Sequence, residues 1–397
     1  MEPLVIITIC LALALLMAEI FNHFKVSIVI GFILAGVILR IPQLNSILVD
    51  SGGMDYIGFL SNLGIIFLLF ITGLEINIFE LRASKKEEGL IAFFSAVLPF
   101  ALGFLTMKLL GFSNLMAFVV GASISVTSEG TKAVILMEFN KLKSKLGTIM
   151  LGAGILDDFF EIGFLSALII FTHTGIGSET AIRELQALPI KILLFIMIIV
   201  LLFKLVLPRL VKHAFARHSQ LTTLSFIIVF FLIMASLSLY FGLGPIIGAF
   251  IAGVLVQMLI HNKRLKERIV REIKDFAYAV IIPFFFIQIG LNFNPEAILK
   301  TPVFFLILLI VAVIGKLFGS LMVKPFSKLR YLQLYLIGWG MNSRGAVGLV
   351  IAEMARSSGI ISIPVYSTLV LVATITTLVF PFVLRYYLTR YPDIMDA

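Results

Sequence analysis

Two adjacent aspartates, Asp157 and Asp158, lie near the middle of an apolar run that extends from Leu146 to Phe171. A run of this length can cross a bilayer as a helix. A charge at the centre of the bilayer costs roughly 2.5 to 3.5 kcal/mol by insertion scales, so two neighbouring carboxylates there need a partner or a use. Acidic residues inside membrane spans commonly mark ion and proton pathways. The pair therefore predicts an ion- or proton-binding site.

Two further apolar segments are interrupted by glycines and polar residues near mid-membrane, between positions 121 and 132 and between positions 338 and 348. A continuous lipid-facing helix would not tolerate such stretches, so both segments are predicted to be broken helices whose unwound backbone faces a cavity. Glu129 in the first segment matches Arg344 in the second. If the two breaks cross, these opposite charges would offset the partial charges of the half-helix ends. We therefore predict that Glu129 and Arg344 are paired.

The composition places this chain in a membrane. Hydrophobic residues make up 60% of its 397 residues and charged residues 13%, far from the balance of soluble domains. Apolar stretches of roughly 20 residues indicate helices, and no alternating pattern of barrel strands competes. The net charge of +9 is explained by basic cytoplasmic loops, so no nucleic-acid partner is expected. A single cysteine excludes intrachain disulfides and cysteine-based metal clusters, and no cofactor is expected.

We predict an all-α membrane protein with about thirteen transmembrane helices. The two interrupted segments are spans 5 and 12, seven helices apart, which suggests two six-helix halves that are inverted in the membrane and joined by span 7. No soluble domain is expected, because the longest connection, between spans 6 and 7, has about 15 residues. The predicted spans are 3–22, 26–40, 57–75, 89–110, 113–138, 146–172, 188–213, 221–240, 243–260, 273–291, 302–323, 331–353 and 363–387.

Basic residues are distributed unequally between the two sets of loops. The densest cluster runs from Lys263 to Lys274, and most of the 31 lysines and arginines fall in loops on the same side. Basic loops stay in the cytoplasm. The rule predicts a multi-pass protein of the cytoplasmic membrane with its N-terminus outside and its C-terminus in the cytoplasm.

Six short motifs follow one another along the chain: Gly31-Phe-Ile-Leu-Ala-Gly36, Leu63-Gly-Ile-Ile-Phe-Leu-Leu-Phe-Ile-Thr-Gly-Leu-Glu75, Thr127-Ser128, Leu156-Asp-Asp158, Gly315-Lys316 and Ser343-Arg-Gly345. Their order resembles the monovalent cation:proton antiporter family, in its NapA-like and Kef-like branch, over essentially the whole chain. The NapA-like sodium exchangers are the nearer match, because Kef-type potassium systems usually lack the first aspartate and carry a cytoplasmic nucleotide-binding domain. In one departure, Ala346 stands where the family commonly has a glutamate after Arg-Gly.

The resemblance implies separate roles for the two aspartates. Asp158 would bind a partly hydrated sodium ion together with oxygens of Thr127 and Ser128. Asp157 would instead face Lys316. Separate roles agree with helix geometry, because adjacent residues on a helix point about 100° apart. Burial and a neighbouring carboxylate both favour the protonated form of an aspartate, so a proton and a cation would compete for Asp158.

Two glutamates are unusual beside these motifs. Glu161 lies one helical turn after Asp157 and Asp158 and therefore near the same face. It is an additional carboxylate that could widen the site, alter the stoichiometry or pair with a lysine. Glu129, next to the Thr-Ser motif, could replace the missing local partner of Arg344.

The resemblance also implies a mechanism and an architecture. Release of Lys316 from Asp157 on cation binding would let the lysine give up a proton, which makes the exchange electrogenic. Residues 88–175 and 300–390 would form the moving core, residues 1–82 and 219–296 a scaffold that forms a homodimer, and residues 188–215 a linking helix. Such a protein would exchange sodium or lithium for protons in pH homeostasis.

Other functions fit the pattern less well. An intramembrane aspartyl protease needs two aspartates that face one another from different helices, so no enzyme activity is expected. A channel usually has rings of groups from symmetric oligomers, unlike this asymmetric carboxylate site. Two alternatives stay open: a potassium/proton antiporter, and a sodium-coupled symporter of an organic anion on a similar inverted-repeat fold. The sequence leaves the choice among sodium, lithium and potassium open.

Overall fold

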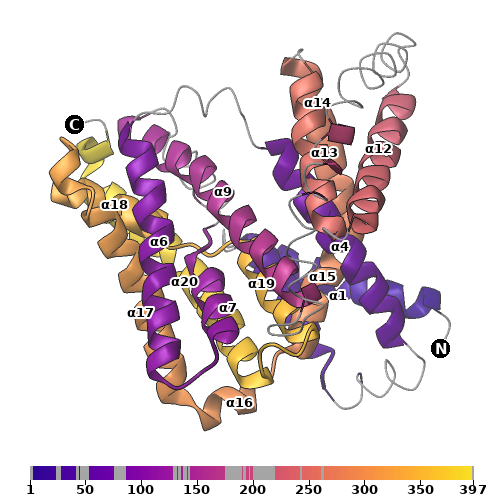
Figure 1. The fold of residues 1–397 in the computed structure, drawn as a ribbon, viewed down its shortest axis with the longest axis horizontal. Coiled ribbons are helices and arrows are strands. Elements are labelled where there is room, and N and C mark those ends of the chain that lie inside the picture. The colour runs from indigo at the N-terminus through magenta and orange to yellow at the C-terminus, as the bar shows by residue number, and fades with distance from the viewer. Residues whose placement is uncertain are drawn as a thin grey trace. The chain divides into compact units, whose positions relative to one another are not determined.

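The computed structural model is helical, with no strand in the part of the chain that it describes (Figure 1). The described residues are 3–23, 28–41, 44, 53–75, 86–127, 132, 136, 141, 144–174, 190, 194–195, 197–199, 220–241, 244–260 and 263–395. The helices are α1 (Pro3–His23), α2 (Ile28–Ile38), α4 (Gly53–Glu75), α6 (Lys86–Leu109), α7 (Asn114–Ser125), α9 (Lys145–Thr174), α12 (Gln220–Tyr240), α13 (Pro245–Leu259), α14 (Lys263–Phe276), η2 (Ala277–Ile281), α15 (Ile282–Asn292), α16 (Pro295–Lys300), α17 (Pro302–Leu321), η3 (Lys324–Phe326), α18 (Tyr331–Gly340), α19 (Ala346–Ser357), α20 (Ile363–Arg390) and η4 (Pro392–Met395).

Among the described helices, seven segments are long and apolar enough to cross a membrane. They are Pro3–His23, Gly53–Glu75, Lys86–Leu109, Thr223–Tyr240, Lys266–Asn292, Pro302–Phe326 and Ile363–Arg390. Three shorter apolar helices, α2, α7 and α13, lie within three other predicted spans. Most of predicted span 7, at 188–213, lies outside the described residues, so the count of thirteen stays a prediction.

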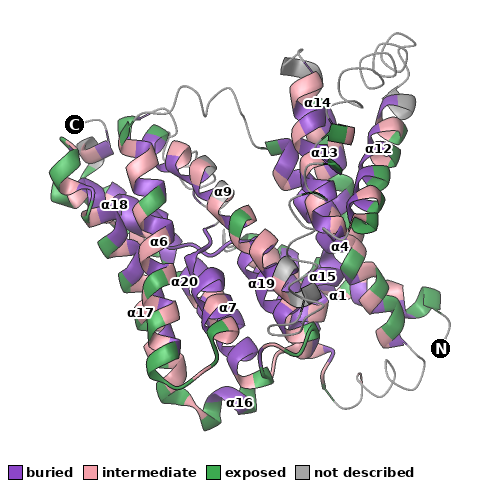
Figure 2. Ribbon diagram, viewed as in Figure 1, coloured by how far each residue is buried: buried purple, intermediate pink, exposed green. Residues whose placement is uncertain are grey.

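Helix α17 illustrates how these helices suit a lipid environment. Exposed and buried positions alternate along α17 (Figure 2). Its exposed large side chains are apolar and recur every three or four residues, which places them on one face of the helix. They are Val303, Leu306, Ile310, Ile314 and Phe318. The opposite face buries Lys316 and Ser320. A helix with an apolar outer face and a polar inner face is the arrangement expected in a bilayer, where a charged group faces the protein interior.

The chain divides into two compact units. The first unit comprises Met1–Leu11, Asn45–Ile78 and Ile169–Gln288, and in it α13 packs against both α4 and α12. An aromatic contact joins two of these helices, because Phe231 of α12 stacks on Phe70 of α4 with centroids 4.4 Å apart. Lys274 of α14 forms an ion pair with Glu75 at the end of α4, with an N–O distance of 2.6 Å.

The second unit comprises Ala12–Leu44, Phe79–Leu168 and Ile289–Ala397. Within it, α6 packs against α7 and α17. The α6–α17 contact is close because glycines face it: a Cβ atom at Gly315 would lie 2.7 Å from Cα of Pro99, and one at Gly319 would lie 2.6 Å from the carbonyl oxygen of Phe94. Small residues four apart let helix backbones approach in membranes. This packing fixes the position of Lys316 beside α6.

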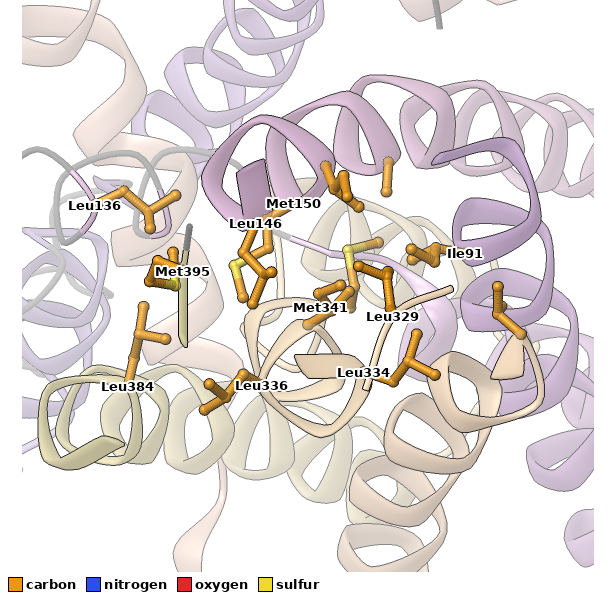
Figure 3. Close-up of a cluster of buried hydrophobic side chains, with 14 of the residues drawn as sticks. Ile91, Leu136, Leu146, Met150, Leu329, Leu334, Leu336, Met341, Leu384 and Met395 are labelled. Atoms are coloured by element: carbon orange, nitrogen blue, oxygen red, sulfur yellow. The ribbon is translucent and has the colours of Figure 1, made fainter. Parts of the chain in front are cut away.

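A cluster of buried apolar side chains forms one core of the second unit (Figure 3). It draws on α6, α9, α18, α20 and η4 and on residues outside these helices, and its members include Ile91, Leu146, Met150, Leu334, Met341 and Leu384. The cluster therefore joins helices from both predicted inverted halves of the chain. The carbonyl oxygen of Met341 also accepts a hydrogen bond from the hydroxyl of Thr127, so this apolar cluster borders a group of buried polar residues.

Two helices end abruptly where the sequence predicts breaks. Helix α7 ends at Ser125, and its C-cap residue Val126 is extended, with φ −67° and ψ 145°. Helix α18 ends at Gly340, and α19 begins only at Ala346. The residues between α18 and α19 are not helical. Backbone groups at both places therefore need partners other than the helix ladder.

Candidate functional site

Three carboxylates lie in the middle of α9 and differ in burial. Asp157 and Glu161, one helical turn apart, are buried, with 1% and 3% of their surface exposed. Asp158 is partly buried. Because neighbouring residues diverge by about 100° on a helix, Asp158 points in a different direction from Asp157. The burial pattern thus separates the two aspartates.

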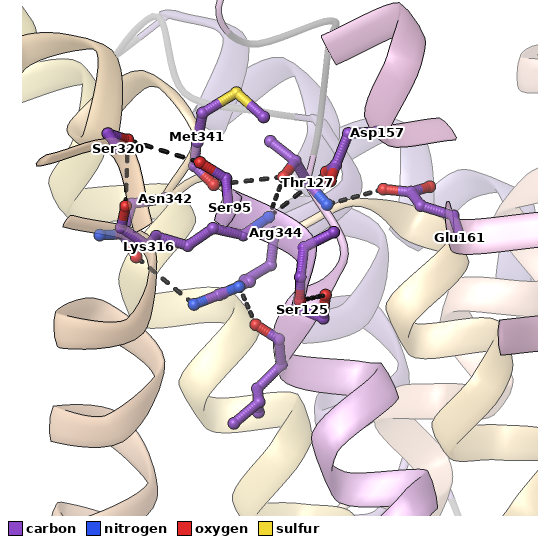
Figure 4. Close-up of polar contacts among 12 residues, drawn as sticks. Ser95, Ser125, Thr127, Asp157, Glu161, Lys316, Ser320, Met341, Asn342 and Arg344 are labelled. Carbon is purple, nitrogen blue, oxygen red and sulfur yellow. Dashed lines mark hydrogen bonds and ion pairs between the residues drawn. The ribbon is translucent and has the colours of Figure 1, made fainter. Parts of the chain in front are cut away.

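Lys316 of α17 reaches Asp157 within the second unit. Its ammonium nitrogen lies 3.3 Å from Oδ2 of Asp157, and neither side chain is accessible, with 0% and 1% exposed. The same nitrogen donates a shorter hydrogen bond, 2.6 Å long, to the hydroxyl of Thr127 (Figure 4). The lysine is therefore shared between a carboxylate and a hydroxyl.

The two carboxylate oxygens of Asp157 differ in their hydrogen bonding. Its buried Oδ1 has no hydrogen-bond partner among the described residues, whereas Oδ2 accepts from Lys316. An unpaired buried carboxylate oxygen is costly, and a proton or a cation would satisfy it. This atom is a place where the site can change its charge.

Thr127 stands at the meeting point of three segments. Its backbone N–H donates to Oε1 of Glu161 on α9 at 2.7 Å. Its hydroxyl accepts from Lys316 and donates to the carbonyl oxygen of Met341, 3.3 Å away, between α18 and α19. The end of α7 is thus tied to α9, to α17 and to the α18–α19 connection (Figure 4).

Arg344 is buried and supports the backbone at the end of α7. Its guanidinium donates to the carbonyl oxygen of Ile124, in the last turn of α7, and to that of Ala312 in α17 at 2.6 Å. A cation at this place is favourable, because the C-terminal end of a helix carries a partial negative charge. Its backbone N–H donates to the hydroxyl of Thr377 in α20 at 3.2 Å. Arg344 therefore supplies a donor to the Ile124 carbonyl, which the end of α7 leaves without a helical partner, and also contacts a carbonyl of α17.

The end of α7 and the start of α19 approach each other closely. A Cβ atom at Gly345, the N-cap of α19, would lie 2.5 Å from the carbonyl oxygen of Thr127. At Gly348 it would lie 2.9 Å from the carbonyl oxygen of Ser123. Only residues without a side chain fit these positions, so the glycines let the two backbones meet beside the carboxylates.

The structure brings together Thr127, Asp157, Glu161 and Lys316, and it places Arg344 in the same unit with backbone carbonyls as partners. Ser128 and Glu129 lie outside the described residues, so the ligand role of the serine and the Glu129–Arg344 pair stay predictions. Sequence reasoning did not find the acceptor role of the Met341 carbonyl. A backbone carbonyl has no signature in a sequence, and no signal could have found it.

Comparisons with known proteins identify similar sequences and a similar fold. A family model described as "Sodium/hydrogen exchanger, transmembrane" matches residues 7–390. The chain is 30% identical to a Na⁺/H⁺ antiporter of Enterococcus hirae, with 98% of each chain covered. It is 29% identical to the Na⁺/H⁺-K⁺ antiporter GerN of Bacillus cereus, with 82% of each covered. The fold is similar to that of the sodium proton antiporter MjNhaP1 from Methanocaldococcus jannaschii, with a TM-score of 0.66, 14% identity, and 98% of this chain and 96% of that one covered.

Proposed function

The chain belongs to the sodium/hydrogen exchanger family, and we propose that it is a secondary transporter that exchanges Na⁺ for protons by alternating access. One observation carries the proposal: the buried ion pair of Lys316 and Asp157 lies beside the partly buried Asp158. A buried charge pair inside a membrane domain is expensive and typically functional. The partly buried carboxylate next to it is the natural ligand for an incoming ion.

In this proposal Asp158 takes a proton and a cation in turn. Carboxylate, hydroxyl and carbonyl oxygens are suitable ligands for a small alkali ion, and Thr127 and Ser128 would contribute such oxygens. The hydroxyl of Thr127 accepts from Lys316 at 2.6 Å, so it becomes available as a ligand only when the lysine moves away. Cation binding and displacement of the lysine are therefore linked steps.

Competition for one carboxylate is enough to couple the two fluxes. The site turns to the other side of the membrane when it holds either ion, and the empty charged site does not. A proton that leaves on one side frees Asp158 for a cation, and the cation that leaves on the other side frees it for a proton. Neither ion then crosses without the other.

Lys316 would make the exchange electrogenic. Its ammonium group is fully buried, and Asp157 and Thr127 are its two acceptors. When a cation draws Asp157 away, the buried ammonium group of Lys316 loses its compensating negative charge. A lone buried charge is costly, and release of the lysine proton removes that cost. More protons than cations would then move in each cycle, and transport would depend on the membrane voltage.

The predicted architecture fits this mechanism. We propose that spans 5 and 12 are discontinuous helices that cross within an inverted repeat of thirteen spans. The abrupt end of α7, the interval between α18 and α19, and the close approach at Gly345 support this. We further propose a moving core at 88–175 and 300–390, a dimer-forming scaffold at 1–82 and 219–296, and a cytoplasmic C-terminus.

The test is proton movement in proteoliposomes with an internal pH dye. Sodium addition should drive proton flux in the wild-type protein, and Asp158→Asn should abolish it because the variant keeps the shape of the side chain but loses its charge. Asp275→Asn makes the same chemical change at an exposed position of α14 and should leave the flux intact. Full activity of Asp158→Asn would remove the basis of the proposal.

Potassium is the second candidate cation. A similar protein, GerN of Bacillus cereus, is named a Na⁺/H⁺-K⁺ antiporter. In the same assay, steps of Na⁺, Li⁺ and K⁺ at equal concentration rank the three ions. A larger proton flux with potassium than with sodium would identify potassium as the preferred substrate and would leave the proposed exchange mechanism unchanged.

A further inference from the structure

Glu161 accepts a hydrogen bond from a backbone group of the candidate ion site. Its Oε1 accepts the N–H of Thr127 at 2.7 Å, and the glutamate is only 3% exposed. We propose that Glu161 is a positioning residue, which holds the Thr127 peptide so that the Thr127 hydroxyl can share Lys316 with Asp157. This inference rests on the exchange function proposed above and names a further residue of that site.

The local backbone explains why Thr127 needs such a partner. Helix α7 ends because Val126 is extended, which turns the N–H of Thr127 away from the helical acceptors of the preceding turn. A buried N–H without an acceptor costs about as much as a lost hydrogen bond. A carboxylate is a strong acceptor for a backbone N–H, and such charge-assisted bonds are short. Glu161 supplies it from α9, one turn beyond Asp157.

Thr127 passes this restraint on to the lysine. The ammonium nitrogen of Lys316 lies 2.6 Å from the Thr127 hydroxyl and 3.3 Å from Asp157. The hydroxyl is therefore the nearer of the two acceptors. If the Thr127 peptide moved, Lys316 would keep Asp157 as its main acceptor, and an incoming cation would have to displace a tighter ion pair.

A positioning role and direct ion binding make different demands on the Glu161 side chain. Glu161 lies one helical turn beyond both aspartates on α9, about 40° around the helix from Asp157 and about 60° from Asp158. Its Oε1 accepts from the Thr127 N–H, which requires an acceptor atom at this reach from α9. The proposed role therefore depends on the acceptor atom and its reach, whereas an electrostatic role would depend on the negative charge.

Two conservative variants separate reach from charge. Glu161→Gln keeps an oxygen acceptor at the same distance from the backbone and removes the charge. Glu161→Asp keeps the charge but shortens the side chain by one methylene, so that its oxygens no longer reach the Thr127 N–H. We expect Glu161→Asp to raise the KM for Na⁺ by about tenfold with a smaller change in kcat, and Glu161→Gln to stay closer to wild type. The reverse order would overturn the proposal and assign Glu161 a direct electrostatic role.

A second background tests the route through the hydroxyl. Thr127→Val retains the backbone N–H that Glu161 binds but removes the hydroxyl that accepts from Lys316. In this background, Glu161→Asp should raise the KM much less than in the wild-type protein. An equal rise in both backgrounds would mean that Glu161 does not act through the Thr127 hydroxyl, which contradicts the proposal.

Amide hydrogen exchange measures the restraint independently of transport. The peptide that contains Thr127 should exchange faster in Glu161→Asp than in wild type or Glu161→Gln. Equal rates of amide hydrogen exchange in all three proteins would refute the positioning role, even if no sodium-driven flux were found. Sodium-driven proton flux is measured in parallel for wild type and Asp158→Asn. If the wild-type protein shows no such flux, the proposed function is refuted. If wild-type flux is normal but Glu161→Gln and Glu161→Asp behave identically, only the role of Glu161 is refuted.

Discussion

Removing one partner of the buried Lys316–Asp157 pair by mutation should destabilise the protein more than removing both partners together. The two charges lie 3.3 Å apart with 0% and 1% of their side chains exposed. At this distance and an effective dielectric constant of about 20, Coulomb's law gives an attraction of about 5 kcal/mol. Much of this is offset by the cost of burying both ions, so the pair as a whole contributes little, whereas a lone buried charge is costly.

These opposing effects give a definite pattern in a double-mutant cycle. Lys316→Met leaves the Asp157 carboxylate uncompensated and should lower the free energy of unfolding by about 3–5 kcal/mol. Asp157→Asn should cost less, because Thr127 still accepts from the lysine at 2.6 Å. The double variant leaves no buried charge, so its loss should fall well below the sum of the single losses.

The assay is reversible unfolding in mixed micelles for the four proteins. The exposed pair of Lys274 and Glu75 serves as a control, because it is shorter, at 2.6 Å, but its side chains are 43% and 49% exposed. A cycle on this pair should give a coupling of about 1 kcal/mol or less. Strictly additive losses for Lys316 and Asp157, or an equal coupling for the exposed pair, would refute the reasoning.

Two further predictions concern the helix breaks. Gly345→Ala should lower the melting temperature and the transport rate, because the added Cβ would lie 2.5 Å from the carbonyl oxygen of Thr127; Gly58→Ala, where a Cβ meets nothing within 4 Å, should change neither. Arg344→Ala should cost about 1–3 kcal/mol in unfolding free energy, because the carbonyl oxygen of Ile124 in the last turn of α7 loses the guanidinium donor. Combining it with Glu129→Ala tests their predicted pairing, since strictly additive losses would show that the two residues do not interact.

Much of the helical framework could be predicted from the chain alone. Apolar runs of about 20 residues predict helices because a bilayer leaves the backbone no other way to satisfy its hydrogen bonds. The described helices α1, α4, α6, α9, α12, α17 and α20 lie close to predicted spans. The ends of α7 and α18 lie within the two segments that the sequence marks as costly in a continuous helix, and the discontinuous spans themselves stay a prediction.

The partners of the buried charged side chains were harder to predict from the sequence. The contact between Lys316 and Asp157 was expected only from a family resemblance, and the structure places the two side chains together. The pairing of Arg344 with Glu129 could not be checked, because Glu129 lies outside the described residues. Instead, Arg344 donates to the carbonyl oxygens of Ile124 and Ala312. Backbone acceptors are identical at every residue, so no sequence pattern could have named them.

By itself, the sequence determined that this protein lives in a bilayer and that α9 carries carboxylates at a depth where charge is costly. Those conclusions follow from composition and run length, which act locally. Only the tertiary structure decided that Glu161 binds the Thr127 peptide and that Lys316 lies nearer to a hydroxyl than to Asp157. Such choices depend on the rotation of each helix and on close packing at glycines, which are fixed by all of the neighbouring helices together.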